Sequence, residues 1–112
     1  MKLTICIRMD LGMGKGKMCG QCAHAAVDAA AHANEKRVNE WYTNGQHKII
    51  LKVKDEQDLL GVAANARAAG LEVFEVRDLG FTQIEPNTLT CISIGPDNEE
   101  KIDAVTKELS LL

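Results

Sequence analysis

Residues 2–33 read KLTICIRMDLGMGKGKMCGQCAHAAVDAAAHA, and this stretch indicates the class of the fold. Residues 2–9 are rich in Ile, Leu and Thr and predict a buried strand. Residues 10–17 carry three glycines, which mark a loop where the backbone turns tightly or closely approaches a ligand. Residues 17–33 are rich in alanine and lack proline, so they predict a long helix. A strand, a glycine-rich turn and a helix in this order are typical of α/β proteins.

The rest of the chain continues the alternation of helices and strands. Asn34 is expected to cap a helix over 35–43, which ends near Gly45. The other expected elements are a strand at 47–54, a helix over 56–69 between the cap Asp55 and Gly70, strands at 71–78 and 89–95, and a helix over 98–109 capped by Asp97. The resulting order, β-α-α-β-α-β-β-α, predicts an α/β three-layer α/β/α sandwich with a four-stranded, mixed and mostly parallel sheet. Residues 1–112 are expected to form a single domain.

The composition excludes several classes of protein. Of the 112 residues, 46% are hydrophobic and 26% are charged, which is typical of a globular chain rather than a disordered one. No apolar run approaches the ~18 residues of a membrane span, and the first residues do not resemble a signal peptide, so a cytoplasmic location is expected. A nucleic-acid-binding protein is expected to be basic on at least one face, and the net charge of −3 argues against such a role. However, residues 1–17 contain four cations and one anion, so the start of the chain is locally basic.

One polar stripe runs along the alanine-rich helix. Lys17, Gln21, His24 and Asp28 are spaced 4, 3 and 4 residues apart, which places them within an arc of about 60°. The residues around them are mostly small and apolar, so most of this helix should be buried. The stripe therefore faces either a polar cleft or simply the solvent.

The glycine-rich loop and the end of the third expected strand are two further candidates for chemistry. GMGKGK (12–17) lacks the spacing of a P-loop, but glycines and lysines at a helix start favour an anion. Asp78 ends the strand at 71–78. Its carboxylate could pair with a lysine or orient a water molecule, or it could serve the following turn through an Asx hydrogen bond.

The four cysteines allow two interpretations. Cys19 and Cys22 have the C-x-x-C spacing of redox and metal sites. A zinc site would need two more ligands, and Cys6 and Cys91 are single and distant, so no metal is expected. Packing of small residues in a crowded helix is the simpler alternative to a redox pair.

Four motifs together resemble those of one known family. They are R-x-D-L-x-M-G-K-G-K at 8–17, Q-x-x-H-A-A-V at 21–27, D-x-G-x-T-Q-I-x-P at 78–86 and I-G-P at 94–96. Over the whole chain, the sequence resembles the archaeal/eukaryotic-type (type II) peptidyl-tRNA hydrolases. The resemblance implies a single α/β domain, usually a homodimer, that hydrolyses the ester between a peptide and the 3′ end of tRNA. It implies no metal or organic cofactor, and peptidyl-tRNA as the partner.

The resemblance also assigns roles to individual positions. The catalytic positions that it assigns are Lys17, Gln21, His24, Asp78 and Thr82. As substrate-binding positions we expect Arg8, Lys15, Gly16, Gly80 and Gln83. We expect Asp78 or His24 to activate a water molecule, and Lys17 to stabilise the oxyanion. We expect Gln21 and Thr82 to hold the terminal ribose, and Lys48 to add a further phosphate contact.

Three other functions remain as alternatives to the hydrolase. They are a non-catalytic tRNA- or protein-binding module of the same fold, a thiol redox protein, and a small-nucleotide binder that uses GMGKGK.

Overall fold

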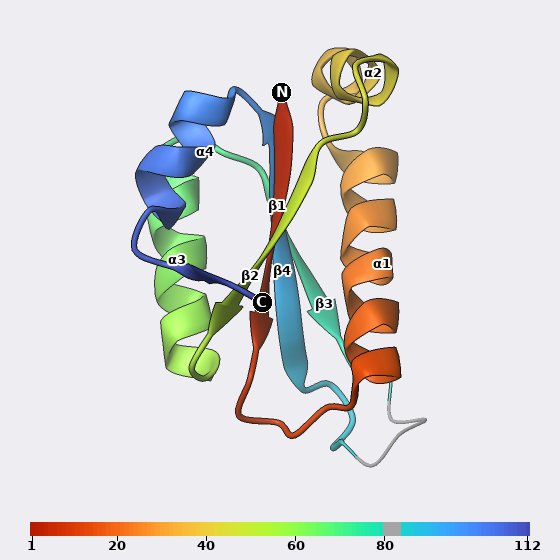
Figure 1. The fold of residues 1–112 in the computed structure, drawn as a ribbon, viewed down its shortest axis with the longest axis vertical. Helices are drawn as coiled ribbons and strands as arrows, with labels where there is room; N and C mark the ends of the chain where they lie inside the picture. Colours follow the sequence, from red (N-terminus) through yellow and green to blue (C-terminus); the bar gives the residue numbers. More distant parts are fainter. Residues whose placement is uncertain (80–83) are drawn as a thin grey trace.

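A single β-sheet lies between two layers of helices (Figure 1). The computed structural model describes residues 1–79 and 84–112. The elements are β1 (Lys2–Arg8), α1 (Lys15–His32), α2 (Glu35–Thr43), β2 (Lys48–Val53), α3 (Glu56–Ala68), β3 (Val73–Arg77), β4 (Leu89–Asp97), α4 (Glu99–Thr106) and β5 (Ser110–Leu111). Helices α1 and α2 cover one face of the sheet, and α3 and α4 cover the other (Figure 1). The predicted α/β three-layer sandwich is confirmed.

The sheet has the strand order β3-β4-β1-β2-β5. Strands β1 and β2 are parallel, while β4 is antiparallel to both β1 and β3. Strands β1, β2 and β3 therefore point the same way, and their carboxyl ends lie at one edge of the sheet. This edge also holds the start of α1.

Two details differ from the sequence-based expectation. A fifth strand, β5, pairs antiparallel with β2, although its two residues are too few to give a pattern in the sequence. The expected predominance of parallel pairing is wrong: among the described residues only the β1–β2 ladder is parallel, because β4 lies between β1 and β3.

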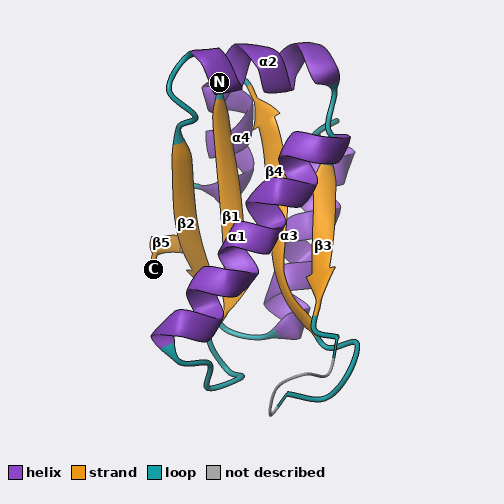
Figure 2. Cartoon of the chain, turned by 90° about the vertical axis from the view of Figure 1, so that its right-hand side faces the viewer, coloured by secondary structure: helices purple, strands orange, loops and turns teal. Residues whose placement is uncertain are grey.

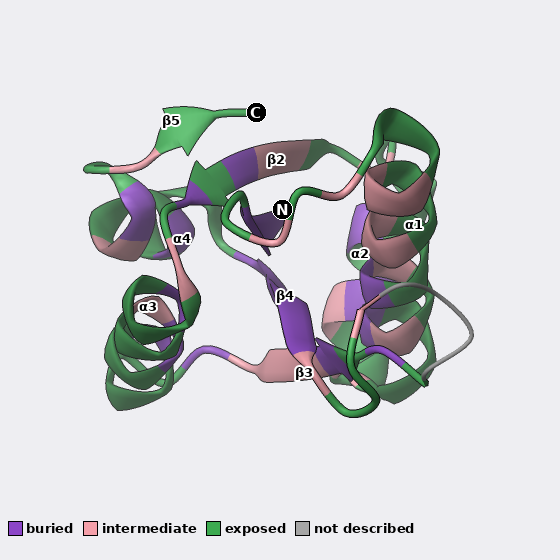
Figure 3. Ribbon diagram, turned by 90° about the horizontal axis from the view of Figure 1, so that it is seen from below, coloured by how far each residue is buried: buried purple, intermediate pink, exposed green. Residues whose placement is uncertain are grey.

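Strand β1 is central and is buried along its whole length. Its side chains alternate between the two faces, as expected for a strand. Leu3, Ile5 and Ile7 pack with Ala25 and Ala29 of α1. On the other face, Cys6 belongs to the core that α3 and α4 cover. Figure 3, the view from below, shows the buried segments between the two helical layers. The small alanines let α1 lie close to the sheet, which fixes where its first turn sits.

Two of the three expected helix caps are confirmed. The side chain of Asn34 accepts a hydrogen bond from the Arg37 N–H at 3.1 Å. The side chain of Asp55 accepts one from the Asp58 N–H at 2.9 Å. The third expectation is wrong, because Asn98 rather than Asp97 caps α4.

The reason for this shift lies in the sheet. Strand β4 continues as far as Asp97, which pairs with Lys2 of β1. The helix therefore starts one residue later than expected. Asn98 accepts hydrogen bonds from the Glu100 and Lys101 N–H groups, whereas the Asp97 carboxylate accepts one from the Asn98 N–H.

Helix α1 crosses its face of the sheet diagonally (Figure 2). Its first turn follows the loop from β1, at the edge where β3 also ends. None of the helices in the described part combines the length and the apolar character that crossing a membrane requires.

Candidate active site

The centre of the candidate site is an ion pair between Lys17 and Asp78. Lys17 lies in the first turn of α1, and Asp78 directly follows β3. The distance from Lys17 Nζ to Asp78 Oδ2 is 2.6 Å. The Asp78 side chain is 2% exposed, whereas the Lys17 side chain is 24% exposed. Lys17 is therefore the member of the pair that reaches the solvent.

The backbone around Asp78 closes the loop that follows β3. The Asp78 N–H donates to the Thr88 carbonyl at 2.9 Å, and the Asp78 carbonyl accepts from the Asn87 N–H at 2.7 Å. These two bonds fix the position of the Asp78 backbone. Its carboxylate pairs with Lys17, which is one of the roles that the sequence suggested for this residue.

The next residue of the polar stripe, Gln21, contacts strand β4. Its Oε1 accepts a hydrogen bond from the Thr90 hydroxyl, and Thr90 is fully buried. Within residues 1–79 and 84–112, the Gln21 amide nitrogen has no hydrogen-bond partner, so it is available to donate to a ligand. The contact orients this amide beside Lys17, one turn away on the same helix face.

Thr90 is a candidate site residue that the sequence analysis missed. It is the second residue of β4, and a threonine in a strand normally indicates only β propensity. The signal that could have identified it is the topology. Because β4 starts at the edge where β3 ends, its first residues lie next to Asp78.

His24 and Asp28 form the C-terminal half of the stripe on α1, away from the Lys17–Asp78 ion pair. His24 Nε2 lies 3.2 Å from Asp28 Oδ2, and the His24 side chain is 47% exposed. His24 lies seven positions after Lys17, which corresponds to roughly 10 Å along the helix axis. The His24 imidazole therefore contacts Asp28, whereas the Lys17 ammonium contacts Asp78.

Arg8 belongs to the framework beneath the site. It is 7% exposed, and its guanidinium donates to Asp10 at 3.0 and 2.8 Å and to the Leu89 carbonyl at 2.9 Å. The hydrogen bond to Asp10 raises the pKa of Arg8 and lowers the pKa of Asp10. Arg8 thus joins the glycine-rich loop to the start of β4. Its predicted contact with substrate stays a prediction.

The other predicted binding residues lie in different places. Lys15 and Gly16 are exposed in the first turn of α1, beside Lys17. Lys48 starts β2 opposite Leu3, at the far end of the sheet from Lys17, and its Nζ lies 5.1 Å from the centroid of the Trp41 ring. The structure therefore does not bring Lys48 to the site. Gly80, Thr82 and Gln83 lie outside the described residues.

The four cysteines are not joined by disulfides in the described part of the chain. Burial raises the pKa of the Cys22 thiol to about 11, and the pKa of Cys6 and of Cys91 to about 12. A thiolate is the reactive form of cysteine, so these three residues are poorly suited to redox chemistry near neutral pH. Cys19 is exposed. Among residues 1–79 and 84–112, no group of three or more His, Cys, Asp or Glu side chains is arranged to hold a metal ion.

Comparison with known proteins identifies the family of this chain. The family model described as peptidyl-tRNA hydrolase PTH2 matches residues 1–112. A peptidyl-tRNA hydrolase of Methanocaldococcus jannaschii is 47% identical over 115 residues, with 100% of both chains covered. Proteins of the same name from Thermoplasma acidophilum (46% identical; 99% of this chain and 97% of the relative) and Methanococcus maripaludis strain C6 (49%; 97% and 97%) are similar to it as well. The chain, with its α/β sandwich and its Lys17–Asp78 pair, belongs to the peptidyl-tRNA hydrolase PTH2 family.

Proposed function

We propose that this chain hydrolyses the ester bond between a peptide and the 3′ end of tRNA, with the Lys17–Asp78 pair as its catalytic centre. Family membership supports the reaction. The observation that supports this catalytic centre is the 2.6 Å contact between Lys17 and Asp78, which lie 61 positions apart in the sequence. The reaction releases the peptide and a free tRNA that can be reused in translation.

Lys17 is the group that faces the substrate. When water attacks the ester carbonyl, negative charge develops on the carbonyl oxygen. An ammonium group held at this point stabilises that charge in the transition state. The partial exposure of Lys17 lets it reach a bound ester, and its place in the first turn of α1 adds the positive end of the helix dipole.

Asp78 holds the ammonium of Lys17 in position. Its side chain is buried, so it acts on the substrate mainly through Lys17. A fixed charge stabilises a transition state better than a mobile one, because no reorganisation is needed at the moment of reaction. That Asp78 or His24 also accepts the proton of the attacking water stays a prediction.

Gln21 is suited to binding the terminal ribose. Its carbonyl oxygen accepts a hydrogen bond from the Thr90 hydroxyl, which leaves the amide N–H groups available to donate. These groups can donate to a ribose hydroxyl or to the carbonyl of the ester. We infer that Thr90 sets the orientation of Gln21 and does not contact the substrate itself.

The family resemblance also implies a homodimer, and the sequence predicts a cytoplasmic location. Both stay predictions. Sedimentation equilibrium of the purified chain tests the first of them, since it measures the mass of the particle in solution.

Release of labelled peptide from peptidyl-tRNA tests the proposal. The unaltered chain should hydrolyse this substrate, and Lys17→Ala should bind tRNA but lose most of the turnover. The alternative is a non-catalytic module of the same fold, which would bind tRNA with no release of peptide. Binding without turnover in the unaltered chain would therefore refute the proposed function.

A further inference from the structure

An apolar groove lies along α1, on the flank opposite the Lys17–Gln21 stripe. We call it the β2-side groove. Its volume is about 400 Å³, and it is lined by Lys15, Met18, Cys19, Cys22, Ile50 and Leu112. The end of the chain closes it, because the Leu112 N–H donates to the Ile50 carbonyl at 3.0 Å. The groove begins at the first turn of α1, which also carries Lys17.

The charge along this groove is positive. Lys15 is the one charged residue of its lining and is exposed. Lys52 follows Ile50 by two positions in β2, so the two side chains project from the same face of the sheet. The register agrees, because Ile50 and Lys52 lie beside Ile5 and Ile7, which face α1. Within the described residues, neither lysine has an ion-pair partner.

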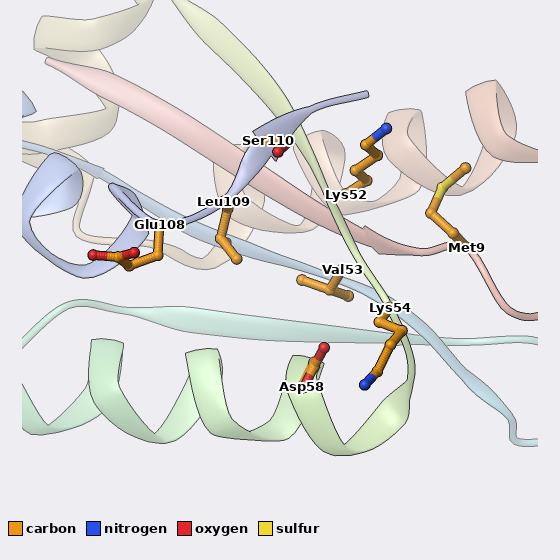
Figure 4. Close-up of a pocket in the computed structure, with 8 residues that line it drawn as sticks. All are labelled: Met9, Lys52, Val53, Lys54, Asp58, Glu108, Leu109 and Ser110. Carbon is orange, nitrogen blue, oxygen red and sulfur yellow. The ribbon is translucent and has the colours of Figure 1, made fainter.

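The neighbouring pocket on the other side of Lys52 has a different character. It has a volume of about 440 Å³ and lies between the end of β2, the start of α3 and residues 108–110 (Figure 4). Asp58 and Glu108 line it together with Lys54, so its charges are mixed. In Figure 4 the amino group of Lys52 points away from both carboxylates. Lys52 is therefore free to serve an anion on the α1 side.

We propose that the β2-side groove holds the single-stranded nucleotides that precede the esterified 3′ end of the tRNA. This inference rests on the proposed function. Single-stranded nucleic acids bind where bases meet apolar or aromatic surfaces and phosphates meet cations. Met18, Cys22, Ile50 and Leu112 supply the apolar floor, and Lys15 and Lys52 supply the cations. The groove begins at the helix turn that also carries Lys17, so a strand in the groove reaches the site of hydrolysis by passing around the start of α1.

The peptide part of the substrate is the competing occupant. A peptide chain has no phosphates, so it gains little from the ammonium groups of Lys15 and Lys52. The positive rim therefore favours the RNA, and the peptide becomes one of the outcomes of the test.

Cys19 provides a direct probe, because it is exposed and lines the groove. N-ethylmaleimide should modify Cys19 of the free protein faster than the half-buried Cys22, whose pKa is about 11. Saturating deacylated tRNA should slow the labelling of Cys19 several-fold. The same tRNA trimmed of its 3′ single-stranded nucleotides should give no such protection. Mass spectrometry of the cysteine-containing peptides measures each rate, and a gel shift confirms that the tRNA is bound.

Four results would overturn the proposal. If Cys19 is labelled equally fast with and without bound tRNA, the RNA does not cover the groove. Protection by the trimmed tRNA would place duplex RNA there, and protection that needs an attached peptide would assign the groove to the peptide. A free protein that does not label at Cys19 would mean that the groove is already covered.

A charge series gives an independent readout. Lys52→Gln should weaken tRNA binding and reduce the steepness of log Kd against log salt by about 0.7, the value for one contact with a single-strand phosphate. Lys36→Gln is the matched control, because Lys36 is an exposed lysine of α2 with no ion-pair partner in the described structure. An unchanged slope in Lys52→Gln would contradict the proposal. If the unaltered protein binds tRNA but does not hydrolyse peptidyl-tRNA, the proposed function fails, while the labelling of Cys19 still decides what the groove binds.

Discussion

Replacing Lys17 by methionine separates two roles of the Lys17–Asp78 pair. Methionine retains much of the apolar stem of lysine but lacks the ammonium group. Loss of one oxyanion donor typically lowers kcat by roughly 10²–10³. The substitution also leaves the Asp78 carboxylate buried without its cation. Breaking a fully buried pair costs about 3–5 kcal/mol, but Lys17 is partly exposed, so we expect about 2 kcal/mol here.

The double variant Lys17→Met/Asp78→Asn tests this reasoning. It also removes the buried negative charge of Asp78, so most of the lost stability should return while hydrolysis stays as low as in Lys17→Met. Thermal unfolding should show a drop of roughly 8 °C for the single variant and a near-complete recovery for the double variant. Peptide release from labelled peptidyl-tRNA gives kcat for each protein. A Lys17→Met protein with unaltered kcat would refute the catalytic role, and a double variant as unstable as the single one would refute the electrostatic argument.

Three further predictions concern the neighbours of this pair. His24→Ala should change kcat by only a few-fold, because the contact seen for this exposed imidazole is Asp28 rather than Asp78; a loss of 10²-fold or more in peptide release would instead identify His24 as the base. Thr90→Val should lower kcat/KM and reduce the free energy of unfolding by about 1 kcal/mol, because Gln21 loses its hydrogen bond. The control is Thr106→Val, which removes a buried hydroxyl on the opposite face of the sheet. In urea unfolding it should lose a similar amount of stability, while its kcat/KM stays unaltered. Cys22→Ser should leave kcat unaltered, because Cys22 lines the β2-side groove and, among the described residues, does not contact the Lys17–Asp78 pair. Alkylation of Cys22 in the unaltered chain should become fast only as the pH approaches about 11, and a loss of kcat in the serine variant would revive the redox alternative.

The local chemistry of the chain predicts much of this fold. Asn34 and Asp55 cap their helices as expected, because a side-chain acceptor before a helical run has a nearby backbone donor. The position of the last cap depended instead on a sheet contact, the pairing of Asp97 with Lys2, which no local pattern reveals. Strand β5 depended in the same way on the exposed edge of β2.

The candidate site likewise has one part that local sequence patterns predict and one part that depends on the sheet topology. The stripe on α1 follows from helical periodicity, so Lys17 and Gln21 could be grouped from the sequence alone. The contact of Lys17 with Asp78 needs the crossing of β4 between β1 and β3, and spacing does not determine that topology. For Arg8, the sequence suggested more than the structure shows. A cation in a basic segment predicts a contact with RNA, but the Arg8 side chain is buried and is hydrogen-bonded to Asp10.

The most direct test of the central claim is single-turnover hydrolysis of peptidyl-tRNA by Asp78→Asn, with enzyme in excess over substrate. This change keeps the shape of the side chain but removes the charge that holds the Lys17 ammonium. We predict a rate about 100-fold below that of the unaltered chain, with an unchanged Kd for tRNA, because displacement of a catalytic group by about 1 Å has an effect of this size. Hydrolysis at the unaltered rate would contradict the claim that Lys17 and Asp78 form the catalytic centre.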